Sequence, residues 1–319
     1  MLLIKKIESI YLKILLDLSK FYIKNRRIST ISKRIINIEE NYTRSLNYKK
    51  AFTTLLNKKI NHLDVGARKG PDERLLKYKE FFSNFLCEPE NQEAKELKKK
   101  DYTVIEKIIS EKIGKKKFYL TNDLMKSSTL KTGGSFQDYF CKDEGIIKCK
   151  INKIVNIEST TLDKIEKEFK IKIHYLKLDT QGSEFLILNS MKKVNPIFIK
   201  TEVSCAELYK NQFLFYDIGK LLHKKGYIIF RNAILNRNAP NSNKFSKSNL
   251  PPSVGLPMHG DVFFMPDWTR KIGRKIIKKN ELHWAAIMLY EGQQQLLYYI
   301  NSIIKLKNRK KINYAISVL

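Results

Sequence analysis

Residues 60–70, INHLDVGARKG, combine an apolar run with an acidic residue and two glycines near its end. The run predicts a buried strand, and the glycine at position 66 lets the chain turn sharply out of that strand. A strand, a glycine turn and a helix form a common start for a ligand-binding α/β unit. The turn lacks the Gly-Lys-Ser/Thr of a phosphate-binding loop and the Gly-x-Gly-x-x-Gly of a dinucleotide fingerprint, so nucleoside triphosphates and NAD are disfavoured as ligands.

Segments typical of strands and of helices alternate after this turn. We expect one strand to end near Cys87 and further strands over residues 102–110, 116–123, 173–180, 196–204, 227–234 and 261–266. We expect helices over residues 160–169, 183–194 and 215–226. This alternation indicates a doubly wound α/β fold, a mostly parallel sheet with helices on both faces. The last two strands have only a long polar loop between them, Leu235 to Gly260, so we expect an antiparallel last strand.

Three acidic residues follow predicted strands: Asp64, Glu88 and Asp179. Ligands of open α/β sheets bind beyond the carboxyl ends of the strands, so these side chains are expected to share one crevice. Asp64 is suited to hold an ammonium group, directly or through water, and Glu88 to accept hydrogen bonds from both ribose hydroxyls of an adenosine. Asp179 would lie beside the reacting atoms. Glu184 starts the next helix, where an acid complements the helix dipole.

These strand ends, in this order, resemble the successive motifs of the FkbM family of class I methyltransferases. The stretches that carry the resemblance are LDVGARKG (63–70), EPE (88–90), KKKFYLTND (115–123) with SST (127–129), TTLDKI (160–165), YLKLDTQGSEFLIL (175–188) and TEVSCAELYKNQFLFYDIGKLL (201–222). The resemblance covers roughly residues 55 to 235, and loosely the strand from Asp261 to Met265. It implies a Rossmann-like doubly wound sheet, S-adenosylmethionine as cofactor, and methyl transfer to a hydroxyl of a sugar, glycan or related metabolite.

The resemblance also implies a set of cofactor-binding residues: Asp64, Gly66, Ala67, Gly70, Glu88, Ser127, Ser128 and Asp179. An alcohol must lose its proton as it accepts a methyl group, and a positioned base accelerates such a step about 10²- to 10⁴-fold. We expect Asp179 to be this catalytic base, with Glu202 and then His259 as the next candidates. A divalent cation between Asp179 and Glu202 is compatible with their oxygen ligands, although no ligand spacing demands a metal. Arg68 and Gln181 depart from the family pattern.

The two ends of the chain are basic and predicted to be helical. We expect an N-terminal extension over residues 1–50, a methyltransferase domain over 51–268 and a C-terminal extension over 269–319. The N-terminal apolar residues recur at helical spacing but are interrupted by charges, which fits neither a membrane-spanning helix nor a secretory signal. They predict an amphipathic helix that either packs on the protein or lies on an anionic membrane surface, in a protein of the cytoplasm.

The formal net charge of +29 would attract polyanions, but a compositional bias toward lysine explains it equally well. The sequence therefore allows three hypotheses about function: an enzyme acting on a small-molecule or glycan acceptor, an RNA methyltransferase, and a non-catalytic protein that binds a membrane or a partner. Nucleic acid is not the expected partner, because the sequence contains no recognisable RNA-binding motif. The acceptor and the oligomeric state stay open.

Overall fold

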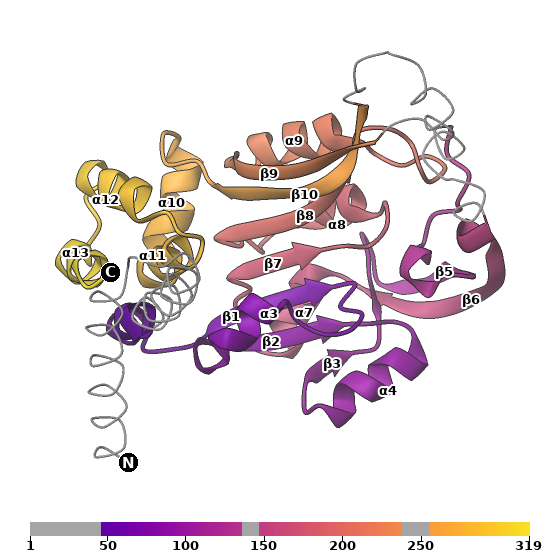
Figure 1. Cartoon of the computed structure of the whole chain (residues 1–319), viewed down its shortest axis with the longest axis horizontal. Coiled ribbons are helices and arrows are strands. Elements are labelled where there is room, and N and C mark those ends of the chain that lie inside the picture. The colour runs from indigo at the N-terminus through magenta and orange to yellow at the C-terminus, as the bar shows by residue number, and fades with distance from the viewer. Residues whose placement is uncertain (1–45, 136–146, 238–254) are drawn as a thin grey trace, which may run out of the picture.

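The computed structural model describes residues 46–135, 147–237 and 255–319. Its main sheet has seven strands in the order β3-β2-β1-β7-β8-β10-β9 (Figure 1). The strands are β1 (Ile60–Val65), β2 (Phe82–Cys87), β3 (Thr103–Ile105), β7 (Tyr175–Leu178), β8 (Phe198–Ser204), β9 (Tyr227–Arg237) and β10 (Leu256–Pro266). The only antiparallel strand among them is β10, which pairs with both β8 and β9. The expected mostly parallel sheet with an antiparallel last strand is confirmed.

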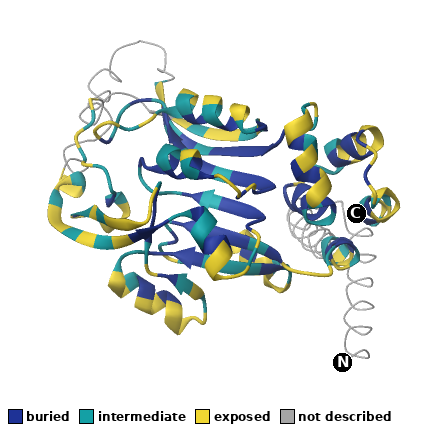
Figure 2. Cartoon of the chain, turned by 180° about the vertical axis from the view of Figure 1, so that it is seen from behind, coloured by how far each residue is buried: buried dark blue, intermediate teal, exposed yellow. Residues whose placement is uncertain are grey.

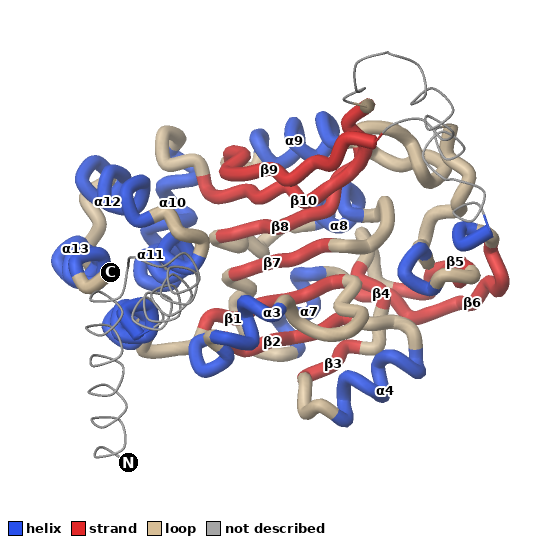
Figure 3. The backbone as a smooth tube through the Cα atoms, viewed as in Figure 1, coloured by secondary structure: helices blue, strands red, loops and turns tan. Residues whose placement is uncertain are grey.

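Helices lie on both faces of this sheet, as expected for a doubly wound fold (Figure 3). One face carries α7 (Leu162–Glu168), α8 (Glu184–Ser190) and α9 (Phe215–Lys224); the other carries α3 (Glu73–Lys77), a 3₁₀ turn η1 (Lys79–Phe81) and α4 (Asn91–Lys99). Thr161 caps α7 by accepting a hydrogen bond from the Lys164 N–H. Seen from behind, the central strands are buried and the exposed residues gather on the outer turns of the helices (Figure 2).

The polar loop expected between the last two strands is shorter than the sequence suggested. The strands extend to Arg237 and back to Leu256, and residues 238–254 lie outside the described part. Gly260, the expected end of the loop, lies inside β10, where a Cβ atom would lie 2.2 Å from the Ala233 carbonyl oxygen. This glycine serves a close approach between two strands, which a sequence pattern alone does not distinguish from a turn.

A second, three-stranded sheet was not expected from the sequence. It has the order β4-β6-β5, with β4 (Ile108–Ile109), β5 (Gly114–Thr121) and β6 (Ile151–Thr160). A 3₁₀ turn, η2 (Leu124–Lys126), follows β5 in the chain. The single strand predicted over residues 102–110 is therefore wrong, because β3 and β4 belong to different sheets. The apolar pattern is continuous across them, and only long-range pairing separates them.

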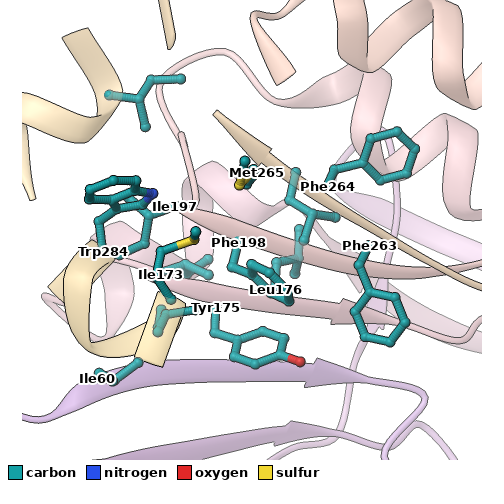
Figure 4. Packing of buried hydrophobic residues seen from close by; sticks show 14 of the residues in the cluster. Ile60, Ile173, Tyr175, Leu176, Ile197, Phe198, Phe263, Phe264, Met265 and Trp284 are labelled. Atoms are coloured by element: carbon teal, nitrogen blue, oxygen red, sulfur yellow. The ribbon is translucent and has the colours of Figure 1, made fainter. Parts of the chain in front are cut away.

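The C-terminal residues form four helices, α10 (Lys271–Lys279), α11 (Glu281–Tyr290), α12 (Gln294–Ile303) and α13 (Arg309–Ser317). The expected helical C-terminal extension is confirmed, whereas most of the predicted N-terminal helix falls outside the described residues. Helix α11 is buried almost throughout, and Trp284 lies in the same apolar cluster as Phe198 and Phe264 of the sheet (Figure 4). The C-terminal helices thus share the core of the sheet. No described helix is long and apolar enough to span a membrane.

Candidate active site

Two adjoining cavities lie at the carboxyl ends of β1, β2, β7 and β8. The first cavity has a volume of about 250 Å³ and is lined by several predicted site residues: Gly66, Glu88, Ser127, Asp179 and Glu202. The second cavity, of about 70 Å³, is lined by Glu202, His259 and Tyr209. Lys126, Gln181 and Glu202 line both cavities, so the two adjoin at these residues. Of the three acidic residues expected to share one crevice, Glu88 and Asp179 line the first cavity, whereas Asp64 does not.

The turn after β1 forms one wall of the first cavity. The N–H groups of Gly66 and Ala67 both donate to the Cys87 carbonyl oxygen, at 3.1 and 3.2 Å. Gly66 has a positive φ of 83°, and an added Cβ atom would lie 1.9 Å from the Asp179 carbonyl oxygen. Glycine is therefore required at this position both by the backbone conformation and by the contact between the turn and the end of β7.

Glu88 extends from the end of β2 into the first cavity, and its carboxylate is almost inaccessible to solvent. One oxygen accepts a hydrogen bond from the Glu90 N–H at 2.9 Å, and the other makes no hydrogen bond to a described residue. Burial raises the pKa of Glu88 to about 7, against the opposing effects of that hydrogen bond and of Arg68. A buried carboxylate with a free oxygen in a cavity is suited to accept hydrogen bonds from ligand hydroxyls.

The raised pKa of Glu88 predicts that removing its charge stabilises the empty protein. Its pKa rises from 4.5 to about 7 on folding, so the folded state binds more protons between these values and stability falls as pH rises through them. We expect Glu88→Gln to be more stable than the natural protein at pH 8, by roughly 3 kcal/mol at most, and equally stable at pH 4. Urea unfolding at both pH values measures the difference. If Glu88→Gln were less stable than the natural protein at pH 8, the prediction that burial of the Glu88 charge destabilises the empty protein would be wrong.

Four other predicted cofactor residues support the cavity without lining it. Asp64 is fully buried and pairs with Lys177 at 2.8 Å, and it is Lys177 that lines the first cavity. Ala67 packs in a small apolar cluster, and Gly70, with a φ of 94°, lies beside that cluster. Ser128 donates a hydrogen bond of 2.7 Å to the Gln181 carbonyl oxygen. These residues shape the loops around the cavity.

Gln181 joins the acidic residues of the two cavities. Its side-chain nitrogen Nε2 donates to Asp179 Oδ1 at 2.9 Å and to Glu202 Oε2 at 2.8 Å. Its side-chain oxygen Oε1 accepts a hydrogen bond from the Tyr209 hydroxyl at 2.9 Å. The side-chain amide of Gln181 therefore occupies the position between Asp179 and Glu202 at which the sequence allowed a divalent cation. Among the described residues, no group of three or more His, Cys, Asp and Glu side chains could hold a metal.

Glu202 and His259 form the polar pair of the second cavity. Glu202 Oε1 lies 3.1 Å from His259 Nδ1, while His259 Nε2 makes no hydrogen bond to any described residue. Burial raises the pKa of Glu202, and the hydrogen bond from His259 opposes the shift. β10 brings His259 to this position by pairing antiparallel with β8, which carries Glu202. A carboxylate that orients an imidazole is an arrangement found in general-base catalysis.

Glu184 holds the turn that carries Gln181. Its carboxylate accepts hydrogen bonds from the Thr180 N–H at 2.7 Å and from the Gly182 N–H at 3.0 Å. Gln181 itself has a positive φ of 56°, an unfavourable conformation for this residue that the turn maintains. Burial raises the pKa of Glu184 to about 7, and neighbouring Glu202 adds to the shift. Glu184 thus fixes the loop geometry.

Sequence reasoning missed several residues that line the cavities, among them Lys126, Lys177 and Tyr209. A lysine inside the otherwise apolar stretch YLKL was a usable signal, because buried strands seldom carry an unpaired charge. Tyr209 lies in one of the stretches that carried the family resemblance, but nothing local showed that its hydroxyl would reach Gln181.

Comparison with known proteins identifies the family. A model of the "Methyltransferase FkbM domain" matches residues 25–229, more than half of the chain. No curated protein matches. The matched residues include the first cavity wall from Gly66 to Asp179 and also Glu202, whereas His259 lies beyond them. The resemblance seen in the motifs is thereby confirmed, and the chain belongs to the FkbM methyltransferase family.

Proposed function

We propose that this protein transfers the methyl group of S-adenosylmethionine to a hydroxyl oxygen of a sugar, glycan or related metabolite. The observation that carries the proposal is that the two cavities adjoin and share Lys126, Gln181 and Glu202. One contains a buried carboxylate at the end of β2, suited to a ribose, and the other contains the Glu202–His259 pair. A cofactor in the first cavity and an acceptor in the second would meet beside Gln181.

The first cavity fits S-adenosylmethionine in its chemistry. Glu88 would accept hydrogen bonds from the ribose hydroxyls, and the Gly66 turn would let the backbone approach the ligand. Asp179, rather than the buried Asp64, offers a carboxylate to the ammonium group, because Lys177 already neutralises Asp64. When bound, the cofactor supplies a methyl group that its sulfonium makes electrophilic.

The protein's task is then to orient the acceptor and to remove its proton. The bound cofactor would supply its methyl group to the acceptor oxygen, with the thioether as leaving group, and His259 Nε2 would accept the hydroxyl proton. Glu202 accepts the hydrogen bond from His259 Nδ1–H, which fixes the tautomer and stabilises the imidazolium that forms. Asp179 is less suited to be the base than the sequence suggested, because Gln181 already donates to one of its oxygens.

Calorimetric titration with S-adenosylmethionine tests the cofactor assignment. We expect micromolar binding by the natural protein and a loss of at least about tenfold in Glu88→Ala, the equivalent of 1.4 kcal/mol. Glu96→Ala is a matched control, because Glu96 lies on the exposed surface of α4 and, within the described part of the chain, pairs only with Lys99. Failure of the folded natural protein to bind the cofactor, or equal binding by Glu88→Ala, would refute the assignment.

A further inference from the structure

A groove lies at the opposite end of the strands from the two cavities, where β1, β2 and β7 begin, beside α7. Its volume is about 1330 Å³, and eight of its nineteen lining residues are lysines. The chain as a whole has 61 lysines and arginines among 319 residues, so the groove has about twice the average density of basic side chains. We call it the lysine groove: Lys58, Lys59, Lys164, Lys167, Lys170, Lys172, Lys192 and Lys193.

The lysine groove has three acidic residues, Glu111, Asp163 and Glu166, and all three are already engaged. Glu111 pairs with Lys116 and accepts a hydrogen bond from the Ser110 hydroxyl at 2.7 Å. Asp163 accepts hydrogen bonds from the backbone N–H groups of Lys192 and Lys193, at 3.0 and 2.7 Å. Glu166 accepts from the Ile173 N–H and pairs with Lys172 at 2.8 Å. Exposed lysines without an ion pair to any described carboxylate remain: Lys58, Lys59, Lys167, Lys170, Lys192 and Lys193. Their charges therefore add to one local positive field.

The floor of the lysine groove is preformed and uncharged. His174 and His283 stack with their ring centroids 4.0 Å apart and their planes at 13°. His174 Nδ1 accepts a hydrogen bond from the Asn61 N–H at 3.0 Å, and burial lowers the pKa of His174 to about 3. Because His283 comes from α11, the C-terminal helices complete this floor.

The shape and composition of the lysine groove discriminate between classes of polyanion. A groove this large and concave suits an extended chain better than a single small molecule or a flat lipid surface. Among the described residues that line it there is no Trp, Tyr or Phe on which nucleic-acid bases could stack, and no arginine for bidentate binding of phosphate. Its two histidines already stack on each other. Its remaining polar groups include asparagine amides and serine or threonine hydroxyls, which can hydrogen-bond sugar hydroxyls.

We propose that the lysine groove binds a strand of acidic polysaccharide, at a site separate from the two cavities. The lysines would neutralise its carboxylate or sulfate groups as mobile point charges. This proposal does not depend on methyl transfer, because the groove and the cavities lie at opposite ends of the strands and share no lining residue.

Fluorescence anisotropy with a labelled heparin octasaccharide and a labelled galacturonate octamer tests the lysine groove. We expect the quadruple variant Lys167→Glu, Lys170→Glu, Lys192→Glu and Lys193→Glu to bind at least about thirtyfold more weakly, a loss of about 2 kcal/mol. Binding by the natural protein should also fall as salt rises from 50 to 200 mM, because exposed charges are screened.

A matched control separates the lysine groove from the overall charge of the chain. The variant Lys95→Glu, Lys100→Glu, Lys278→Glu and Lys279→Glu changes the net charge equally at exposed positions outside the groove. We expect it to bind within about threefold of the natural protein. Equal weakening in both variants would refute the proposal, as would tighter binding of a dT12 oligonucleotide or of phosphatidylserine vesicles than of the octasaccharides.

The groove variants must remain folded for this comparison to count. Thermal unfolding and S-adenosylmethionine titration of both quadruple variants serve this purpose, because neither set of lysines lines the cavities. If the glutamate variant unfolds, glutamine at the same four positions removes the charges without adding repulsion. Undiminished octasaccharide binding by this glutamine variant would refute the proposal. Loss of octasaccharide binding with intact cofactor binding supports the groove independently of the proposed reaction.

Discussion

Replacing His259 by alanine is expected to lower kcat by about 10²- to 10⁴-fold while leaving the affinity for S-adenosylmethionine nearly unchanged. The reason is that His259 lines the second cavity and not the first, in which we propose that the cofactor binds. Single-turnover kinetics at saturating cofactor, with an acceptor found by screening hydroxyl compounds and glycans, measures the effect.

Glu202→Gln separates orientation from proton transfer. The variant keeps a hydrogen-bonding side chain but removes the charge that stabilises the imidazolium, so we expect kcat to fall and its pH dependence to change. His223→Ala is the control, because His223 lies on the exposed side of α9, outside both cavities. Full turnover in His259→Ala together with its loss in Asp179→Asn would instead support the base that the sequence first suggested.

Replacing Gly66 by alanine is expected to destabilise the protein by at least about 3 kcal/mol. The positive φ costs an alanine about 1–2 kcal/mol, and its Cβ atom would lie 1.9 Å from the Asp179 carbonyl oxygen. Because that neighbour is backbone, the turn must move away from the end of β7, which distorts the first cavity. Urea unfolding and cofactor titration of the same sample report both effects.

Gly219→Ala is the matched control for Gly66. Gly219 lies within α9, and a Cβ atom there would meet no other atom within 4 Å. Alanine favours the helix and restricts the unfolded chain, so we expect a gain of about 0.4–1 kcal/mol. If Gly66→Ala were as stable as Gly219→Ala, the close contact between the β1 turn and β7 would not exist in solution.

The parts of the site that could be predicted are those encoded locally. The turn at Gly66 and the acidic strand end at Asp179 each follow from a short run of residues, and both line the first cavity. The Asp64–Lys177 ion pair joins residues 113 positions apart, so no local pattern contains it. It arises because β1 and β7 are neighbours in register, which depends on the order of the strands.

The second cavity and the second sheet show the same limit of sequence reasoning. Glu202 and His259 were candidates separately, but their pairing depends on β10 lying against β8, which no short pattern specifies. The ten residues of β6 are largely exposed or half-buried and mix polar with apolar side chains. Such a strand gives a weak periodic signal, because its identity depends on the partners it finds.

The place of β10 in the sheet has a consequence for the order of folding during synthesis. β8 and β9 leave the ribosome before β10 but are separated by it in the finished sheet, so until residue 266 emerges the two strands lack their shared partner. The nascent chain can form the wall that contains Gly66 and Glu88 from its earlier strands. It cannot bring His259 to Glu202 until nearly the whole sheet has been made, so the wall around Gly66 and Glu88 can form before the Glu202–His259 pair.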